Sequence, residues 1–159
     1  MLNFQNPLKT ELLFNARFFI DPNTDNWFDV GDGGNGRRLI APVNSDGGVF
    51  EGPRLRGTLQ PSFGADWVRF RDDGIGNVDV RCVLRTIDGA LIHMYYDGLV
   101  FYDIPAVDYP GATLVHTTPR FETGHEKYRW LNTIMCVGVG KTGKNASQRF
   151  LEYSIYAMV

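Results

Sequence analysis

Apolar and polar residues alternate along much of this 159-residue chain. The clearest example is the segment 149–159, where Leu151, Tyr153, Ile155 and Ala157 occupy one set of alternate positions. The other set holds mainly polar and aromatic side chains. Because successive side chains of a β-strand point to opposite faces, this period of two predicts a strand.

Shorter segments of β-forming residues, separated by glycine, proline and asparagine, predict further strands. They lie at 11–21, 27–30, 37–43, 54–59, 67–71, 77–86, 91–102, 115–121 and 134–139. A helix is an alternative for 11–21, because its alternation is poor, and Pro119 makes 115–121 an edge or bulged strand. Turns are predicted at Gly47-Gly48 and Gly52-Pro53. The loop 103–113 contains two prolines and is a candidate lid or subunit contact.

The predicted fold is all-β, a single closed antiparallel β-barrel with one short helix near the C-terminal third. Turns every 8–12 residues are typical of a sandwich or a barrel. We favour the barrel because the long last strand can pair with the first, which leaves no exposed edges. The helix is expected at 125–132, where Tyr128 and Leu131 lie three apart. The length predicts one domain over 1–159, with a core from about residue 10.

The hairpin around Asp88-Gly89 gives a register that can be tested. If these two residues form the loop, Leu84 pairs with His93 and Arg81 pairs with Tyr96. Asp79, Arg81 and Tyr96 then share one face. Such a face is either a ligand-facing barrel interior or an ordinary solvated surface.

Composition and charge narrow the class of protein. Eighteen glycines with 11 Phe, 7 Tyr and 3 Trp favour a β-rich fold, and the net charge of −2 gives no long-range attraction for nucleic acid or anionic membranes. No apolar segment approaches 18 residues, and no signal peptide is evident. Cys82 and Cys136 lie in separate predicted strands and read as buried reduced thiols. We therefore expect a soluble cytoplasmic protein.

Sequence motifs argue against metal and nucleotide chemistry. The three histidines, His93, His116 and His125, lack the spacing of a metal site. The glycine-rich segment 31–36 precedes a predicted strand and lacks the Lys-Ser/Thr of a phosphate-binding loop, and no dinucleotide motif is present. No cofactor is expected. What remains is acid-base chemistry by carboxylates and tyrosine in an apolar pocket.

The stretch 47–67 interleaves glycine, charge and aromatic residues, and we interpret it as the wall of a site. The alternative is a charged hairpin rim. Asp66 is either a catalytic acid or base or a turn cap. Trp67, Tyr96 and Trp130 are candidate flat walls for an aromatic ligand, and the alternative is that the two tryptophans are plain core residues.

Several short motifs, in this order, resemble a family of small bacterial and fungal β-barrel proteins of unknown function. The motifs are GGVFEGPRLRG (47–57), GADW (64–67), RTIDGALI (85–92), TPRFETG (118–124), WLN (130–132) and the closing pair Tyr153 and Tyr156. The resemblance covers roughly residues 10–159. The resemblance implies a single-domain barrel that tends to self-associate. The family includes a phenazine (pyocyanin) demethylase, which acts without a metal or an organic cofactor.

The resemblance also implies site residues. Asp66 matches an acidic site residue, Arg120 or His116 a site cation, and Tyr156 the closing tyrosine. Ser154 stands where a carboxylate would help, and Glu152 on the same face is a substitute. Asp79 is added as a substrate-binding residue from the predicted hairpin face.

Two functions follow as hypotheses. The first is a cofactor-independent enzyme that acts on a small hydrophobic or aromatic metabolite by demethylation, elimination or isomerisation. The second is a binding or carrier barrel of the lipocalin type, and a purely structural subunit is a third reading. The enzyme requires that at least three ionisable residues point into one cavity, from the set Asp66, Asp79, Arg81, Arg120, Glu152 and Tyr156. The expected partners are a small molecule and further copies of the chain, as a dimer or trimer, with no nucleic acid and no membrane.

Overall fold

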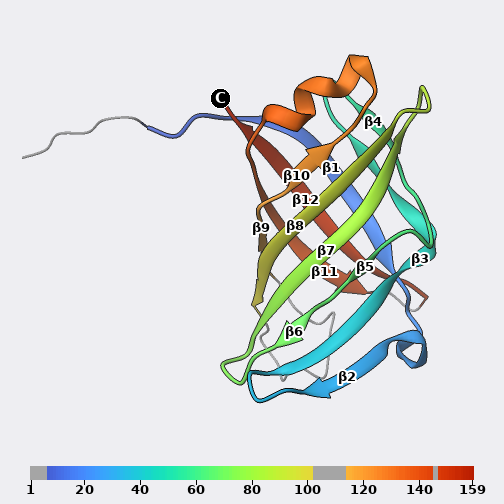
Figure 1. The fold of residues 1–159 in the computed structure, drawn as a ribbon, viewed down its shortest axis with the longest axis vertical. Helices are drawn as coiled ribbons and strands as arrows, with labels where there is room; N and C mark the ends of the chain where they lie inside the picture. The colour runs from blue at the N-terminus through green and yellow to red at the C-terminus, as the bar shows by residue number, and fades with distance from the viewer. Residues whose placement is uncertain (1–6, 102–113, 145–146) are drawn as a thin grey trace, which may run out of the picture.

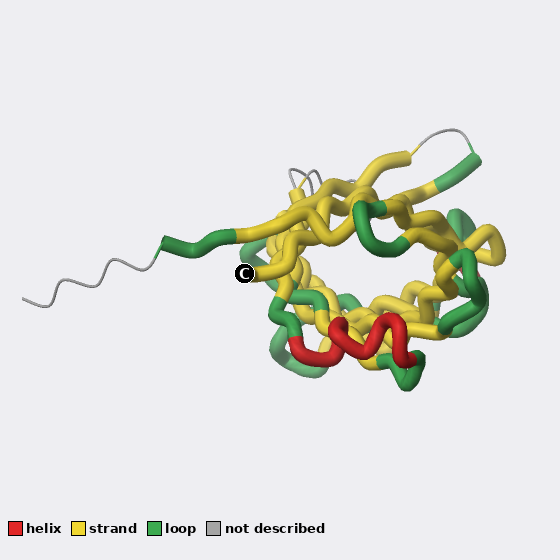
Figure 2. The backbone as a smooth tube through the Cα atoms, turned by 90° about the horizontal axis from the view of Figure 1, so that it is seen from above, coloured by secondary structure: helices red, strands yellow, loops and turns green. Residues whose placement is uncertain are grey.

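The computed structural model describes residues 7–101, 114–144 and 147–159, which build a closed antiparallel β-barrel (Figures 1 and 2). Eight strand positions follow one another around the wall, in the order β1, β3, β4, β7, β8, β9, β11 and β12. β5 and β6 continue the position of β4, because all three strands pair with β3 and β7. β10 continues the position of β9, because both pair with β8. The predicted all-β barrel is confirmed.

The strands have the following bounds. They are β1 (Thr10–Ile20), β2 (Phe28–Asp32), β3 (Arg37–Glu51), β4 (Arg56–Leu59), β5 (Ala65–Asp66), β6 (Arg69–Phe70), β7 (Ile75–Thr86), β8 (Leu91–Phe101), β9 (Leu114–Thr117), β10 (Arg120–Glu122), β11 (Cys136–Lys144) and β12 (Arg149–Met158). Two 3-10 helices are η1 (Thr24–Asn26) and η3 (Glu126–Thr133). The loop predicted at 103–113 lies outside the described residues.

The first strand closes the barrel against the last. Thr10 pairs with Met158 at one end of this seam and Ile20 with Arg149 at the other. The apolar set of β12 that alternation indicated, Leu151 to Ala157, faces the interior and is buried. The pattern of the sequence therefore identified both the seam and the buried face of β12.

The turn predicted at Gly47-Gly48 is wrong, because β3 runs through both glycines. Gly47 has a φ of +62°, and a Cβ there would lie 2.1 Å from the carbonyl oxygen of Leu59. A glycine in this left-handed conformation is typical of a β-bulge. The bulge lets β3 pair with β5 and β6 through its first half and with β4 through its second.

The predicted register of the β7–β8 hairpin is also wrong, by one residue. Thr86, not Ile87, donates its backbone N–H to Ala90, and Gly89 has a φ of +88°. The loop thus has three residues, with glycine in the left-handed position that such loops favour. Val80 therefore pairs with Tyr96 and Arg81 with Tyr95. A slip of one residue exchanges the two faces of a strand, so Tyr96 points inward while Asp79 and Arg81 point outward.

The helix η3 covers the upper end of the barrel in Figure 1. Apolar side chains of the core pack beneath it. Phe14 and Phe50 are buried there with ring centroids 5.2 Å apart, and Leu131 of η3 has no exposed surface. Burying each such side chain stabilises the fold by about 1.5–3 kcal/mol. The helix expected at 125–132 is thus confirmed, and it caps the core. The buried polar side chains considered below lie further down the barrel interior.

Candidate functional site

Asp66 is a buried carboxylate on the inner face of the wall. It belongs to the two-residue strand β5 and lies in one cross-strand row with Ala41, Val80 and Tyr96. Only 5% of Asp66 is exposed, and one carboxylate oxygen accepts the backbone N–H of Asp79 at 3.1 Å. A buried carboxylate needs such donors to offset the loss of water. Of the catalytic residues expected from the sequence, Asp66 alone lies inside the barrel.

Two tyrosines meet across the middle of the barrel near this row. Tyr96 comes from β8 and Tyr153 from β12, and their hydroxyl oxygens lie 3.2 Å apart. Tyr153 pairs with Gly140 of β11, and a Cβ at Gly140 would lie 2.6 Å from the tyrosine ring. Glycine at this position therefore lets the ring lie against β11 and direct its hydroxyl toward Tyr96.

The interior keeps both tyrosines protonated. Burial, reinforced by neighbouring Tyr153, raises the pKa of Tyr96 well above its usual value, and the charge of Asp66 adds to this effect. Burial likewise raises the pKa of Tyr153, with a further contribution from Asp66. Burial also raises the pKa of the Cys82 thiol to about 12. At neutral pH the hydroxyls are therefore hydrogen-bond donors, and the thiol is inert.

Asp66 and Tyr96 share the wall of a small interior cavity. Its volume is about 30 Å³, and the rest of its lining is almost wholly apolar, including Phe18, Val80 and Leu151. This is room for about one water molecule. The cavity can therefore hold a single polar atom beside Asp66 and Tyr96.

The remaining residues predicted from the 47–67 stretch and the hairpin lie elsewhere. Asp79 is on the outer face of β7, paired with Arg81 at 3.0 Å. Trp67 is also on the outer wall, with its ring centroid 5.5 Å from the Arg81 guanidinium carbon. Trp130 lies in η3 at the upper end, where the Arg54 guanidinium carbon is 3.6 Å from its ring centroid. These residues do not line the cavity beside Asp66.

The two candidate cations also lie on the outer face. His116 of β9 is exposed, and its ring meets Phe101 edge-on with centroids 5.5 Å apart. Arg120 of β10 is exposed and pairs with Tyr95 of β8. Neither side chain approaches the interior, because each occupies the strand position opposite to a buried neighbour.

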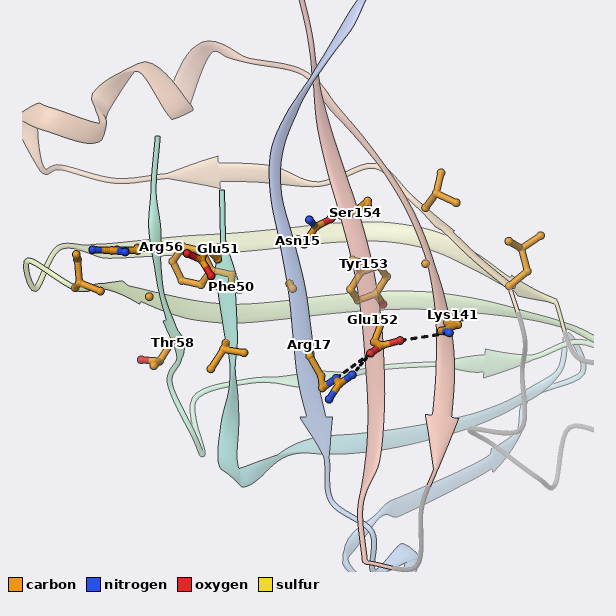
Figure 3. A pocket seen from close by; sticks show the side chains of 17 residues that line it. Asn15, Arg17, Phe50, Glu51, Arg56, Thr58, Lys141, Glu152, Tyr153 and Ser154 are labelled. Carbon is orange, nitrogen blue, oxygen red and sulfur yellow. Dashed lines mark hydrogen bonds and ion pairs between the residues drawn. The ribbon is translucent and has the colours of Figure 1, made fainter. Parts of the chain in front are cut away.

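Glu152 and Tyr156 share the outer face of β12. Glu152 accepts hydrogen bonds from Arg17 and lies 3.5 Å from the Lys141 amine, within a shallow outer hollow of about 1,070 Å³ (Figure 3). The bonds from Arg17 lower the pKa of Glu152. The inward member of the closing pair is Tyr153. Alternation already placed Tyr153 with the apolar set of β12, and that signal outweighs the resemblance that pointed to Tyr156.

Two findings concern metals and membranes. Among residues 7–101, 114–144 and 147–159, no three His, Cys, Asp or Glu side chains are placed to share a metal ion. No helix in the described part of the chain is long and apolar enough to cross a bilayer.

Known proteins of similar sequence and fold place the chain in a family. A UPF0311 protein of Bradyrhizobium diazoefficiens is 34% identical over 110 residues, which are 64% of this chain and 70% of the relative. A β-barrel-like protein of Acinetobacter baumannii superposes with a TM-score of 0.77 at 27% identity, over 99% of this chain and 100% of the other. The structure of an enzyme from Penicillium herquei superposes over the whole of both chains with a TM-score of 0.69, and its 23% identity shows the fold alone.

The family-level resemblance seen in the sequence is confirmed, whereas the link to a phenazine demethylase stays a prediction. The model of the family described as protein of unknown function (DUF3237) matches residues 8–158. This chain belongs to the DUF3237 family.

Proposed function

We propose that this protein is a cofactor-independent enzyme that moves a proton to or from a small hydrophobic or aromatic metabolite. The observation that carries the proposal is the buried carboxylate of Asp66, which shares an apolar cavity with Tyr96. Tyr96 is in turn hydrogen-bonded to Tyr153. A base and neutral donors in a dry site are the elements of general acid-base catalysis.

Each of the three side chains has a role. Asp66 takes the proton, and Tyr96 donates a hydrogen bond to the oxygen on which negative charge develops. Tyr153 supports Tyr96 through the bond between their hydroxyls. Tyr96 and Tyr153 thus replace the cation sought at Arg120 or His116. Isomerisation and elimination fit best, because both need only an acid and a base.

The size of the cavity limits how a metabolite binds. Drug-sized ligands occupy pockets of about 300–1,000 Å³, far more than the roughly 30 Å³ here. We therefore expect the cavity to receive only the reacting oxygen. The body of the metabolite would displace apolar side chains of the lower interior, such as Phe18 and Leu151.

The test is a thermal-shift screen against flat aromatic metabolites, including phenazines and quinones, followed by product analysis. A ligand at 100 times its dissociation constant adds about 2.7 kcal/mol to stability. Asp66→Asn is expected to lower turnover at least about 100-fold. Asp79→Asn, a carboxylate on the outer face of the same wall, is the matched control and is expected to retain full activity. Turnover that survives Asp66→Asn would overturn the proposal.

A second candidate is a binding barrel without catalysis. One observation favours it: of Asp66, Asp79, Arg81, Arg120, Glu152 and Tyr156, only Asp66 faces the interior, which is fewer than the three that the enzyme hypothesis required. The enzyme proposal therefore rests on Tyr96 and Tyr153, two buried ionisable side chains outside that set. A ligand that stabilises wild type and Asp66→Asn equally, and is never converted, would establish this function. In either case we propose a cytoplasmic location, which two buried cysteines without a disulfide support.

A further inference from the structure

The outer wall carries a cleft where the chain leaves the barrel between β4 and β5. Gln60 still donates its backbone N–H to Val83, and Ala65 pairs with Arg81, but the residues between them turn outward. Ser62 in this turn has a φ of +65°, a left-handed conformation that is uncommon outside glycine. Such strain often accompanies functional sites. The next residue, Phe63, is 72% exposed.

The floor of the cleft is free of large side chains. A Cβ on Gly64 would lie 2.4 Å from the carbonyl oxygen of Arg81, so only glycine fits against β7. Ala65, Cys82 and Val83, none of them aromatic or long, line the cleft beside Gly64. The cleft has a volume of about 540 Å³, within the range of small-molecule sites.

Flat side chains surround this floor. Phe63, Trp67 and His93 all line the cleft. His93 is held by stacking on Tyr95, with centroids 5.2 Å apart and an angle of 25° between the rings. Aromatic walls of this kind favour a planar ligand.

Arg81 supplies a charge at the same place. Its guanidinium contacts the Trp67 ring and uses one nitrogen to bind Asp79 at 3.0 Å. Within the described residues, its other nitrogens have no recorded hydrogen-bond partner. Glu122 is the other acid near the cleft, and it lies 3.5 Å from Nδ1 of His93. A guanidinium with donors to spare is suited to bind a carboxylate.

We propose that this outer cleft is a second ligand site that binds a planar aromatic carboxylate. The ring would lie between Phe63 and Trp67, and the carboxylate would accept hydrogen bonds from Arg81. The cleft lies on the opposite face of the wall from the Asp66 carboxylate, so it stands independently of the function proposed for the interior.

Calorimetric titration with 2-naphthoate tests the site, with 2-naphthamide as an uncharged probe of the same shape. We expect Arg81→Gln to weaken naphthoate binding at least tenfold and to leave naphthamide binding unchanged. Trp67→Leu is expected to weaken both probes. Arg85→Gln is the matched control, because Arg85 lies on the same outer face of β7 but bonds Gln60 away from the cleft. Thermal melts of each variant verify that it is folded.

Three results would overturn the proposal. One is the absence of naphthoate binding to wild type at millimolar concentration. Another is equal affinity of naphthoate for wild type and Arg81→Gln. The third is naphthoate binding that is lost in Tyr153→Phe and kept in Arg81→Gln, which would assign the ligand to the barrel interior.

Discussion

At the scale of single residues, burial keeps the two tyrosines of the interior neutral. Tyr96 and Tyr153 are almost fully buried, and one hydrogen bond joins their hydroxyl groups. An unpaired buried hydroxyl would cost about 1–3 kcal/mol. The bond gives each hydroxyl a partner, and removing a proton from either one would place a charge in the apolar interior.

This gives a prediction for alkaline pH. An unfolded tyrosine titrates near pH 10, and the folded pKa values of Tyr96 and Tyr153 are raised above that. Their contribution to stability is therefore complete below pH 10 and is lost as the pH rises toward the folded pKa. Above pH 10 the free energy of unfolding is expected to fall by about 1.4 kcal/mol per pH unit for each tyrosine. Urea unfolding between pH 8 and 11 measures this slope.

The matched variants are Tyr96→Phe and Tyr95→Phe, which remove a hydroxyl from the inner and the outer face of the same strand. Tyr96→Phe is expected to flatten the slope, and Tyr95→Phe to leave it unchanged. Identical slopes in wild type and Tyr96→Phe would contradict the prediction.

At the scale of elements, the alternation of apolar residues predicted which face of a strand is buried, but it did not predict how neighbouring strands pair. The buried face of β12 follows from its own sequence, because apolar residues alternate there over the whole strand. The facing of β8 against β7 depended instead on whether the hairpin loop has two residues or three. Asp-Gly suits both, and Gly89 adopts the left-handed conformation in either. A difference of one residue in loop length thus decided whether Tyr96 shares the inner face with Asp66 or the outer face with Asp79.

One carboxylate at the tip of that hairpin, Asp88, joins η3 to the barrel. The Asp88 carboxylate accepts hydrogen bonds from the Lys127 amine at 2.6 Å and from the Tyr128 hydroxyl at 2.9 Å. It also accepts a hydrogen bond from the Thr86 hydroxyl. The bond from Lys127 holds the pKa of Asp88 well below its usual range. Its stabilising contribution is therefore present above about pH 4 and is lost as the pH falls further.

Asp88→Asn is accordingly expected to loosen η3 without unfolding the barrel. Hydrogen exchange of the backbone amides at 126–133 should become at least about tenfold faster, while those of β1 and β12 keep their protection. Asp73→Asn serves as the control, because Asp73 pairs with Arg71 in the turn before β7. Uniformly faster exchange in all strands would show that Asp88 supports the whole fold and not η3 alone.

At the scale of the whole molecule, an apolar patch interrupts the outer wall. Val137, Tyr156 and Leu12 lie in one cross-strand row, and Met158 donates its backbone N–H to Met135 beside them. Leu12, Met135 and Met158 are all more than a third exposed. Apolar patches of this kind mark contacts between proteins. Tyr156, first assigned to the site, lies at the centre of this patch.

We therefore expect the chain to self-associate as a dimer or trimer through this patch. Light scattering after gel filtration should give a multiple of the monomer mass for wild type, and a monomer for Val137→Glu. Val49→Glu introduces the same charge at an exposed valine of β3 and should leave the mass unchanged. A monomeric wild type at tens of micromolar would refute the expectation.

The architecture was the most predictable level, and the site was the least. Closure followed from the long alternating last strand and its need for a partner. The site did not follow, because sequence alone could not show which of several charged residues face inward. Asp66 was found from its motif. Tyr153 lies three residues before Tyr156, the tyrosine that was chosen. Identifying it required knowing which alternate positions of β12 face inward.

The seam between β1 and β12 has a consequence for how the protein is made. It joins residues at opposite ends of the described chain, Thr10 and Met158, and closing so long a loop costs entropy before any contact compensates for it. Closure of the barrel is therefore expected to be slow. Both β1 and β11 keep an unpaired edge until β12 has been synthesised. On the ribosome, the strands that precede β12 therefore emerge as an open sheet, and its apolar inner face stays exposed to water until β12 pairs with both β1 and β11.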